Sequence, residues 1–423
     1  MCKSYRPRQA KASPLYQCLK ASAPDFYRLY PEKYEATLGP LRPDLEDAFQ
    51  QFLRCGDLTQ GFMRVRCEHC EHEYLLPFTC KQRGICPTCH QRRTLDTAEN
   101  IVSEICVPVP HRHWVFAIPR VLRNAFRKDP KRLSVLCKVV VQLLSDWIRE
   151  QSGLPDGKVG IILAIHSFGD YLAFHPHIHI IATAGVFDGN GTFQLTPIGD
   201  LPSLKELFRH ALLKALLDHH WTSQRQVTKL LGWRNSGFQI DAGEAAIGAD
   251  NERARRQLSE YLLRAPLSLQ KMSWNGTTKT VLYRSSRSWK TKRNFEVYSG
   301  PDFIAALSEH IPPKSFQTIR YYGYYSNKSR GMRKKARTTC STPPSNDSKS
   351  ASITSKNLSR RKRMWRTRIM DIWGYDPLLC PCCRGSMKVI STIQTLGAIR
   401  DVLVPLGLWA RTTFHSALDG GCA

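Results

Sequence analysis

The chain has 423 residues, 42% of them hydrophobic, which is enough to bury a substantial core and to form two or three domains. Lysine and arginine number 62 against 35 aspartates and glutamates, a formal net charge of +27. This composition excludes a disordered chain, and its charge favours a polyanionic partner. Nucleic acid is the first candidate. The alternatives are an anionic membrane surface, or charge that only keeps the protein in solution.

The N-terminal sequence "MCKSYRPRQAKASPLYQCLK" has no apolar signal segment, and no later apolar run approaches the ~18 residues that span a bilayer. We therefore expect a cytoplasmic protein. In a cytosolic chain, the fifteen cysteines are better explained as metal ligands or buried thiols than as disulfides. Their spacing separates these two explanations.

Helical and strand-like patterns alternate along the chain. Helical spacing is present in residues 44–58, 92–105, 133–151, 203–221, 250–264 and 301–311. Short β-branched and aromatic runs predict strands at residues 113–119, 158–168, 175–187, 278–286 and 294–300. The turn signal Gly169-Asp170 separates the second and third of these runs and indicates a hairpin. This order predicts an α+β fold with a mostly antiparallel sheet.

Two Cys-x2-Cys pairs are separated by fifteen residues, which is the spacing of a four-thiolate zinc site. We expect the ligands to be Cys67, Cys70, Cys86 and Cys89. Because all four positions would be thiolates, such a zinc ion is structural and has no open position for substrate. Neighbouring residues that could replace a ligand or hold a second ion are Cys80, His69, His72 and His90.

A third pair, Cys380 and Cys383 in "CPCC", is only half a site. Cys382 and Cys422 are the candidates to complete it, and the alternative is that no metal binds there. Cysteines within apolar stretches, such as Cys106, are expected to be buried packing residues.

In "FHPHIHII", His175, His177 and His179 recur at period two, so on a β-strand all three side chains point to one face. Two such imidazoles form a rigid pair for a divalent ion. The third ligand is expected to be His166, eleven residues before His177 on the other arm of the hairpin. His175 and Asp170 remain alternatives for that ligand, and the alternative for the whole strand is structural, partly buried histidines.

The segment "RYYGYYSN" places four tyrosines in five positions. Tyr321 and Tyr325 are four residues apart, so in a helix they would share one face. A phenol with a pKa near 10 needs a cation, a base or a metal-polarised electrophile to act as a nucleophile. Attack on a phosphodiester would leave a phosphotyrosine bond. The alternatives are a stacking platform for single-stranded bases or half-buried sheet residues.

Basic residues flank these tyrosines, and we expect them to bind the phosphates of a nucleic acid strand. They are Arg320, Lys328, Arg330, Arg333, Lys334 and Lys335.

Taken together, these motifs resemble a bacterial family of insertion-sequence proteins. "HPHIHII" resembles the HUH motif (His, bulky hydrophobic, His), and "RYYGYYSN" resembles the tyrosine motif of two-tyrosine rolling-circle transposases. The block "RCEHCEHEYLLPFTCKQRGICPTCHQRR" resembles the N-terminal transposase zinc-binding domain of the IS91 family. "YLLRAPLSLQKM" and "CPCCRGSMKVI" also match that family, although Cys382 departs from the basic or polar residue expected there.

The resemblance implies a metal-dependent endonuclease and strand transferase for single-stranded DNA at transposon ends and targets. It implies an HUH endonuclease-like central antiparallel sheet with helices on one side. His177 and His179 would bind catalytic Mg²⁺ or Mn²⁺, while Tyr321 would be the leading nucleophile and Tyr325 the second. Such a protein would be associated with the nucleoid. Two rival hypotheses are a non-catalytic, zinc-dependent DNA-binding protein and a metallonuclease that uses water as its nucleophile.

We expect four parts along the chain: a zinc-binding DNA-binding domain over residues 1–105, a catalytic domain over 106–335, a flexible basic Ser/Thr-rich linker over 336–362, and a small Cys-containing tail over 363–423. The linker is predicted from the change in composition after Lys334.

Overall fold

A computed structural model describes residues 10–287, 292–339, 366–367, 370, 376 and 378–409. These residues divide into two compact units. One unit combines residues 10–13 and 50–81 with described residues from 366 onward, and the other contains residues 14–49 and 82–339. Residues 340–362 of the expected linker, and Cys422, lie outside the described residues.

The helices are α1 (Pro14–Leu29), α2 (Glu35–Leu38), α3 (Pro43–Arg54), α4 (Pro87–Asn100), α5 (Arg120–Arg127), α6 (Leu133–Ser152), α7 (Leu201–Asp218), α8 (Gln224–Leu231), α9 (Glu252–Leu262), α10 (Gly300–Ser308), α11 (Asn327–Thr339) and α13 (Leu396–Leu403). The strands are β1 (Phe62–Cys67), β2 (Glu73–Pro77), β3 (His111–Ala117), β4 (Gly160–Phe168), β5 (Phe174–Thr183), β6 (Gly185–Phe187), β7 (Phe193–Leu195), β8 (Gln239–Asp241), β9 (Met272–Asn275), β10 (Thr280–Arg284), β11 (Phe295–Ser299), β12 (Ile319–Gly323) and β13 (Met387–Ile393). No helix in this part of the chain is long and apolar enough to cross a membrane.

The larger unit is built on a five-stranded sheet with the order β12-β4-β5-β3-β8. Every neighbouring pair in it is antiparallel, which confirms the predicted α+β fold with a mostly antiparallel sheet. The central strands β4 and β5 are almost entirely buried, because helices cover both faces of the sheet.

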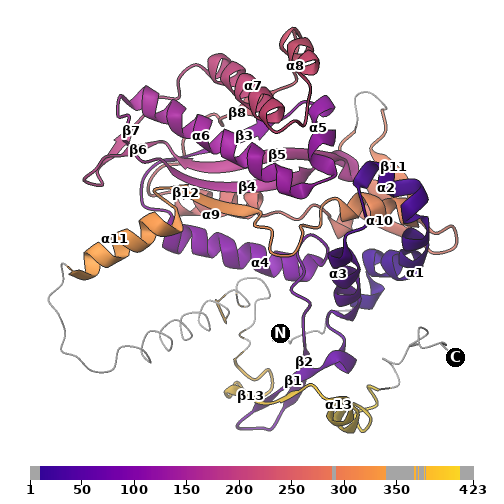
Figure 1. Cartoon of the computed structure of the whole chain (residues 1–423). Helices are drawn as coiled ribbons and strands as arrows, with labels where there is room; N and C mark the ends of the chain where they lie inside the picture. The colour runs from indigo at the N-terminus through magenta and orange to yellow at the C-terminus, as the bar shows by residue number, and fades with distance from the viewer. Residues whose placement is uncertain are drawn as a thin grey trace. The chain divides into compact units, whose positions relative to one another are not determined.

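On one face, Trp114, Phe116 and Leu163 pack with apolar residues of α6 and α7. The opposite face, which carries Ile162 and Ile181, packs against α4, the π-helical turn Ile101–Ile105 and α9. Figure 1 shows α6 and α7 on one side of the strands and α4 on the other. The expectation of helices on one side only is therefore wrong, because apolar side chains alternate onto both faces of these strands.

The structure confirms the expected hairpin as β4 and β5 and supplies its register, which the sequence left open. His166 lies directly opposite His177, and Ala164 lies opposite His179. Directly opposed residues of an antiparallel pair share a face, so His166, His177 and His179 project from the same side of the sheet. This placement confirms that the two arms of the hairpin share a histidine-bearing face.

The tyrosine segment is a strand followed by a turn, not a helix. Tyr321 pairs with Ile162 and Tyr322 with Ile161, and β12 ends at Gly323. Gly323 has φ +55°, and a Cβ there would lie 1.9 Å from the carbonyl oxygen of Val159, so only glycine fits this turn. Tyr321 and Tyr325 therefore do not share a helix face, the arrangement considered from their spacing, and α11 begins only at Asn327.

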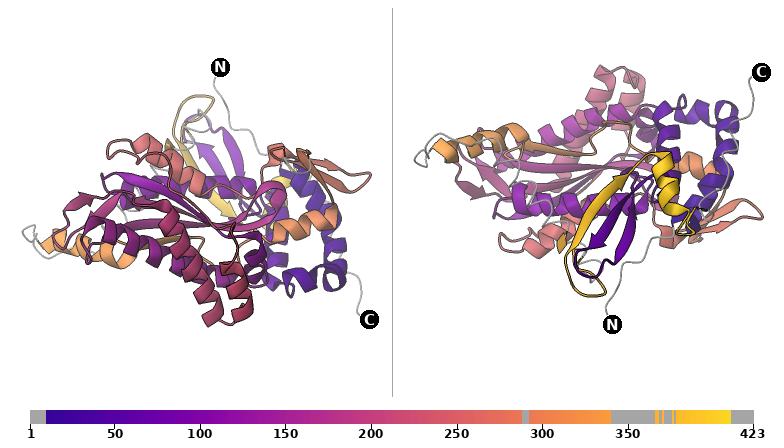
Figure 2. Two further views of the ribbon diagram at one scale, coloured as in Figure 1. Left: turned by 90° about the horizontal axis from the view of Figure 1, so that it is seen from above. Right: turned by 90° about the horizontal axis from the view of Figure 1, so that it is seen from below.

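In the smaller unit, β1 pairs with β2 on one side and with β13 on the other. Figure 2 shows the C-terminal strand in yellow beside the indigo strand from the N-terminal part. Buried Phe62 packs with Ile399 and Leu403 of α13. This division differs from the expected domain boundaries, since residues 14–49 and α4 belong to the larger unit and residues 378–409 to the smaller one.

Candidate active site and metal centres

Three buried histidines on β4 and β5 form one group, with ligand atoms of His166, His177 and His179 all within 4.8 Å of one another. His166 Nε2 donates to the carbonyl oxygen of Leu262 (2.7 Å). Because Nε2 then carries the proton, Nδ1 presents a lone pair, and that atom is buried without a hydrogen-bond partner. Its lone pair is available to an ion.

In the other two histidines, too, one ring nitrogen has a hydrogen-bond partner and the other is left for an ion. His177 Nδ1 donates to the carbonyl oxygen of His175 (2.7 Å), which leaves the Nε2 lone pair available. His179 Nδ1 lies 3.0 Å from Nε2 of His113, and its own Nε2 is buried without a partner. Hydrogen bonds from the non-ligating nitrogen are what fix the tautomer of metal-binding histidines. The donor set therefore fits a divalent metal ion.

The electrostatics of the group keep its imidazoles neutral. Burial lowers the pKa of His166 to about 3, with a further contribution from His177. Burial, followed by His166 and His177, lowers the pKa of His179 still further. A neutral imidazole is the form that binds metal, so the group needs no proton release near pH 7.

The two alternative third ligands lie outside this group. His175 supplies only its carbonyl oxygen to His177, and the Asp170 carboxylate accepts a hydrogen bond from the Ser285 hydroxyl (2.6 Å).

Tyr325 is fully buried at the turn after β12. Its hydroxyl lies 2.6 Å from Nε2 of His111 and accepts a weak hydrogen bond from the Val107 amide (3.4 Å). Burial raises the pKa of Tyr325 well above the usual value for a phenol. A Cβ at Gly160 would lie 2.8 Å from the Tyr325 ring, so this glycine makes room for it.

Tyr321 lies on the same sheet face as the histidines, opposite Ile162. Because Ile162 is four residues before His166, strand geometry places the Cα atoms of Tyr321 and His166 roughly 14 Å apart. Burial raises the pKa of Tyr321, and the Arg330 guanidinium, 5.5 Å from the ring centroid, opposes that rise. The structure thus brings the three histidines together but does not bring either tyrosine to them.

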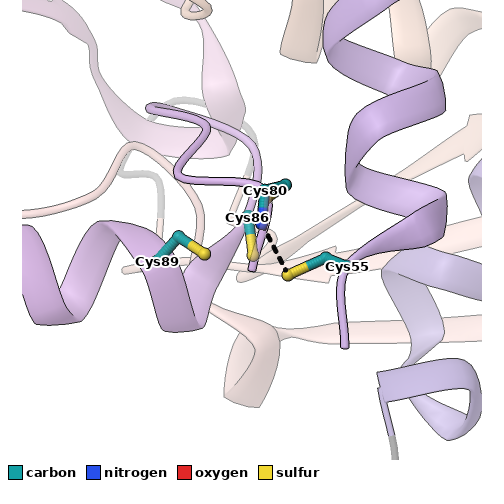
Figure 3. A group of neighbouring side chains, drawn as sticks. All are labelled: Cys55, Cys80, Cys86 and Cys89. Atoms are coloured by element: carbon teal, nitrogen blue, oxygen red, sulfur yellow. Dashed lines mark hydrogen bonds between the residues drawn. The ribbon is translucent and has the colours of Figure 1, made fainter. Parts of the chain in front are cut away.

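The cysteines form two groups of four, each with sulfur atoms within 4.8 Å of one another. The first group is Cys67, Cys70, Cys380 and Cys383, and the second, drawn in Figure 3, is Cys55, Cys80, Cys86 and Cys89. The expected set of Cys67, Cys70, Cys86 and Cys89 is therefore split between two groups. His69, His72 and His90 belong to neither group.

Comparison with known proteins identifies the family of the chain that carries these histidine and cysteine groups. Residues 26–118 match the family model described as "Transposase zinc-binding domain", which belongs to the IS91 group. Residues 160–333 match the two-tyrosine family model described as "Putative transposase". The chain is a transposase of the IS91 family.

Two curated relatives are similar to this transposase along most of its length. One is the transposase for insertion sequence element IS801 from Pseudomonas savastanoi pv. phaseolicola, 26% identical over 313 residues, which are 70% of this chain and 73% of the relative. Another, described as "Putative transposase y4qJ", is from Sinorhizobium fredii and is 22% identical over 389 residues, 86% of this chain and 94% of the relative. No solved structure matches.

The basic residues around the tyrosines of this transposase differ in their surroundings. Arg320 donates to the hydroxyl of Ser134 (2.8 Å) and lies on the sheet face opposite the histidines. Arg333 donates to the carbonyl oxygen of Tyr324 (2.7 Å) and stacks on its ring at 3.6 Å. Lys328, Arg330, Lys334 and Lys335 all lie on α11.

Two residues near the histidines were missed by sequence reasoning. The ring of Tyr261, on α9, lies 5.5 Å from the ring of His179, and the Arg264 guanidinium lies 4.6 Å from the Tyr261 ring. Arg264 also lines a cavity of about 100 Å³ next to His166, together with Arg83 and Arg93. The signal was present in "YLLRAPLSLQKM", which contains both residues but shows no metal-ligand spacing.

Proposed function

We propose that this transposase cuts and rejoins single-stranded DNA at transposon ends and targets, through a tyrosine and an HUH-like metal site. The observation that carries the proposal is the convergence of three imidazole lone pairs, on His166, His177 and His179, beside an arginine-lined cavity. Guanidinium groups bind phosphate oxygens in fixed geometry, so the cavity suits a DNA backbone. The DNA would be that of the nucleoid, in the cytoplasm.

In the proposed step, the phenol oxygen attacks a phosphorus atom of the DNA backbone. A tyrosyl O–P bond forms, the P–O3′ bond breaks, and the 3′ oxygen leaves with the proton that the phenol gives up. The product is a 5′-phosphotyrosine and a free 3′-hydroxyl. A divalent ion bound by the histidines would stabilise the charge that develops on the phosphate.

Tyr321 is the first nucleophile in this proposal, and Tyr325 is the second. The order follows from burial, because the Tyr325 hydroxyl is occupied by His111 and lies in the core. Since Tyr321 starts roughly 14 Å from His166 by strand geometry, DNA binding must shift the end of β12 or its side chain toward the histidines. Arg330, which lies over the Tyr321 ring, favours the phenolate form.

The proposed cofactors are a catalytic divalent ion and structural zinc. A set of three imidazoles suits first-row transition ions better than Mg²⁺, which prefers oxygen ligands. We therefore expect Mn²⁺ to support cleavage better than Mg²⁺. The two four-cysteine groups have the donor type of structural zinc sites.

The test is formation of a covalent adduct. The purified chain is incubated with a labelled single-stranded oligonucleotide from a transposon end, with and without Mn²⁺, and then denatured. We expect an adduct that needs the metal, is lost in His177→Ala, and maps by peptide mass spectrometry to Tyr321. Tyr261→Phe is the control phenol, since it lies beside the histidines.

Three outcomes would contradict the proposal in different ways. An unchanged adduct in the double variant Tyr321→Phe, Tyr325→Phe would show that the nucleophile is misassigned. Cut DNA with free ends and no adduct would favour a metallonuclease that uses water. Salt-sensitive binding without cleavage, unaffected by His177→Ala, would favour a non-catalytic DNA-binding protein.

A further inference from the structure

Two four-residue turns in the smaller unit share two backbone features. In the first, Cys67 to Cys70, the amide of His69 lies 3.4 Å from the Cys67 sulfur, and the next residue, Glu71, has φ +60°. In the second, Cys380 to Cys383, the amide of Cys382 lies 3.4 Å from the Cys380 sulfur, and Arg384 has φ +63°. Left-handed backbone is unfavourable for side chains such as Glu and Arg, so its presence after both pairs indicates one shared constraint.

The shared feature of the turns is that each aims its two sulfurs toward the other pair. An amide that points at a sulfur stabilises the thiolate, which is the form that binds metal. The turns also touch, because a Cβ at Gly385 would lie 2.4 Å from Cδ2 of His69. Only glycine allows this close approach of the second turn to the first.

The distances between the four sulfurs match a tetrahedral ion and not a disulfide. Cys67 lies 3.4 Å from Cys383, and Cys70 lies 3.5 Å from Cys380, sulfur to sulfur. Zn–S bonds of about 2.3 Å in a tetrahedron place sulfur atoms roughly 3.8 Å apart, whereas a disulfide requires about 2.0 Å. All four sulfurs lie within 4.8 Å of one another, so none of the four is misplaced for a common ion.

The strands around the turns hold the two halves in register. Cys67 ends β1 opposite Met387, which begins β13, and the Glu68 amide donates to the carbonyl oxygen of Ser386 (3.1 Å). Val65, Cys67, Cys380 and Met387 form a separate buried cluster. Such a small core stabilises a sheet only weakly, and structural metals commonly supply the missing stability in units of this size.

We propose that Cys67, Cys70, Cys380 and Cys383 bind one structural zinc ion. The C-terminal "CPCC" segment then completes the N-terminal zinc-binding domain, although Cys70 and Cys380 are 310 positions apart in the sequence. Cys382, the remaining thiol of that segment, is exposed and lies outside the four-cysteine group. The proposal concerns only this metal site, so it stands or falls independently of DNA cleavage.

The first experiment uses the unaltered full-length chain. Its cysteines are alkylated under native conditions, with and without a zinc chelator, and the labelled positions are quantified by peptide mass spectrometry. We expect Cys382 to react at once, while Cys67, Cys70, Cys380 and Cys383 stay protected and become reactive together as the chelator removes zinc. Reaction of Cys380 and Cys383 before chelation, with Cys67 and Cys70 still protected, would overturn the proposal.

The second experiment measures zinc per chain in purified variants. Cys380→Ser with Cys383→Ser should lose one equivalent of zinc, as should Cys67→Ser with Cys70→Ser. Combining both pairs should cause no further loss, and Cys382→Ser is the matched control that keeps its zinc. Full zinc content in the Cys380, Cys383 variant would overturn the proposal. The Cys380, Cys383 variant could keep its full zinc content while the Cys67, Cys70 variant and a Cys86, Cys89 variant each lose the same equivalent of zinc. In that case the ion would be bound by Cys67, Cys70, Cys86 and Cys89, the four ligands expected from the sequence spacing.

Discussion

Tyr325 and His111 form a buried polar pair that links the turn after β12 to the first residue of β3. Removing the hydroxyl in Tyr325→Phe leaves His111 Nε2 buried without that partner. We expect this to lower the free energy of unfolding by about 1–3 kcal/mol, the usual cost of an unsatisfied buried group. Urea denaturation of the variant and the natural chain measures this difference in the free energy of unfolding. Tyr322→Phe is the control, since Tyr322 is only partly buried, and equal stability in the two variants would contradict the pairing.

The same histidine makes stability depend on pH. Burial first, then the Arg255 guanidinium, lowers the pKa of His111 from 6.5 to about 4, with the Tyr325 hydroxyl as its ring partner. Because the folded pKa is below the unfolded value, this contribution is present above pH 6.5 and is lost as the pH falls toward 4. Between pH 7.5 and 5 it amounts to about 2 kcal/mol.

The comparison that isolates this effect is between the natural chain and His111→Gln. The stability advantage of the natural chain should shrink by about 2 kcal/mol between pH 7.5 and 5, as measured by urea denaturation at each pH. An advantage that is constant with pH would show that His111 has an ordinary pKa in the fold.

Arg330 should set the pH dependence of the proposed nucleophile. Its guanidinium opposes the rise in the pKa of Tyr321 that burial causes. In Arg330→Gln we therefore expect slower adduct formation at pH 7 to 8 and a rate profile displaced to higher pH, with Arg330→Lys closer to the natural chain. A uniform loss of rate at every pH would mean that Arg330 only helps to bind DNA.

At the scale of elements, the sequence predicted the β4–β5 hairpin better than it predicted β12. The eleven-residue separation of His166 and His177 contains a strong turn signal, so the sequence predicted a hairpin, while the exact register of its strands comes from the structure. The segment around Tyr321 carries side chains that suit either a strand or a helix. Its pairing with Ile162, some 160 residues earlier, decides in favour of the strand, and no local pattern contains that information.

The cysteine groups also depend on contacts between segments far apart in the sequence, which local patterns do not predict. The Cys-x2-Cys turns were visible in the sequence because each is a local feature. Which pairs meet depends on β13 lying beside β1, and "CPCC" alone looked like half a site for that reason. Cys55 lies near the end of a helix, outside any ligand motif, so nothing in its neighbourhood identified it.

The strand β4 should tolerate no side chain at its first residue. A Cβ at Gly160 would lie 2.8 Å from the Tyr325 ring and 3.0 Å from Thr183 Cγ2. We expect Gly160→Ala to lower the free energy of unfolding by about 1–3 kcal/mol, because overpacking a core forces neighbours out of place. Gly189→Ala is the matched control, since no atom lies within 4 Å of a Cβ there. Thermal denaturation compares the two, and equal stability would show that Tyr325 moves aside freely.

At the scale of the whole molecule, the smaller unit depends on the C-terminal segment. A chain that ends at residue 365 lacks β13 and α13, which leaves β1 unpaired on one edge and removes the side chains that cover Phe62. We expect that chain to aggregate and to bind less zinc, since exposed strand edges pair with other chains. Size-exclusion chromatography compares it with a control chain that ends at residue 409. Equal behaviour of the two chains would contradict the role of β13.

The pairing of β1 with β13 also has a consequence for how the protein is made. A ribosome that adds 5–20 residues per second needs roughly 15–60 s to travel from β1 to β13. During that interval the N-terminal strand has no partner on one edge, while the strands of the five-stranded sheet, which lie between β1 and β13 in the sequence, are synthesised. A message cut short before "CPCC" would yield a protein with the histidines and tyrosines but with an unfinished N-terminal sheet. The second edge of β1 is therefore paired only in chains whose translation has continued past β13.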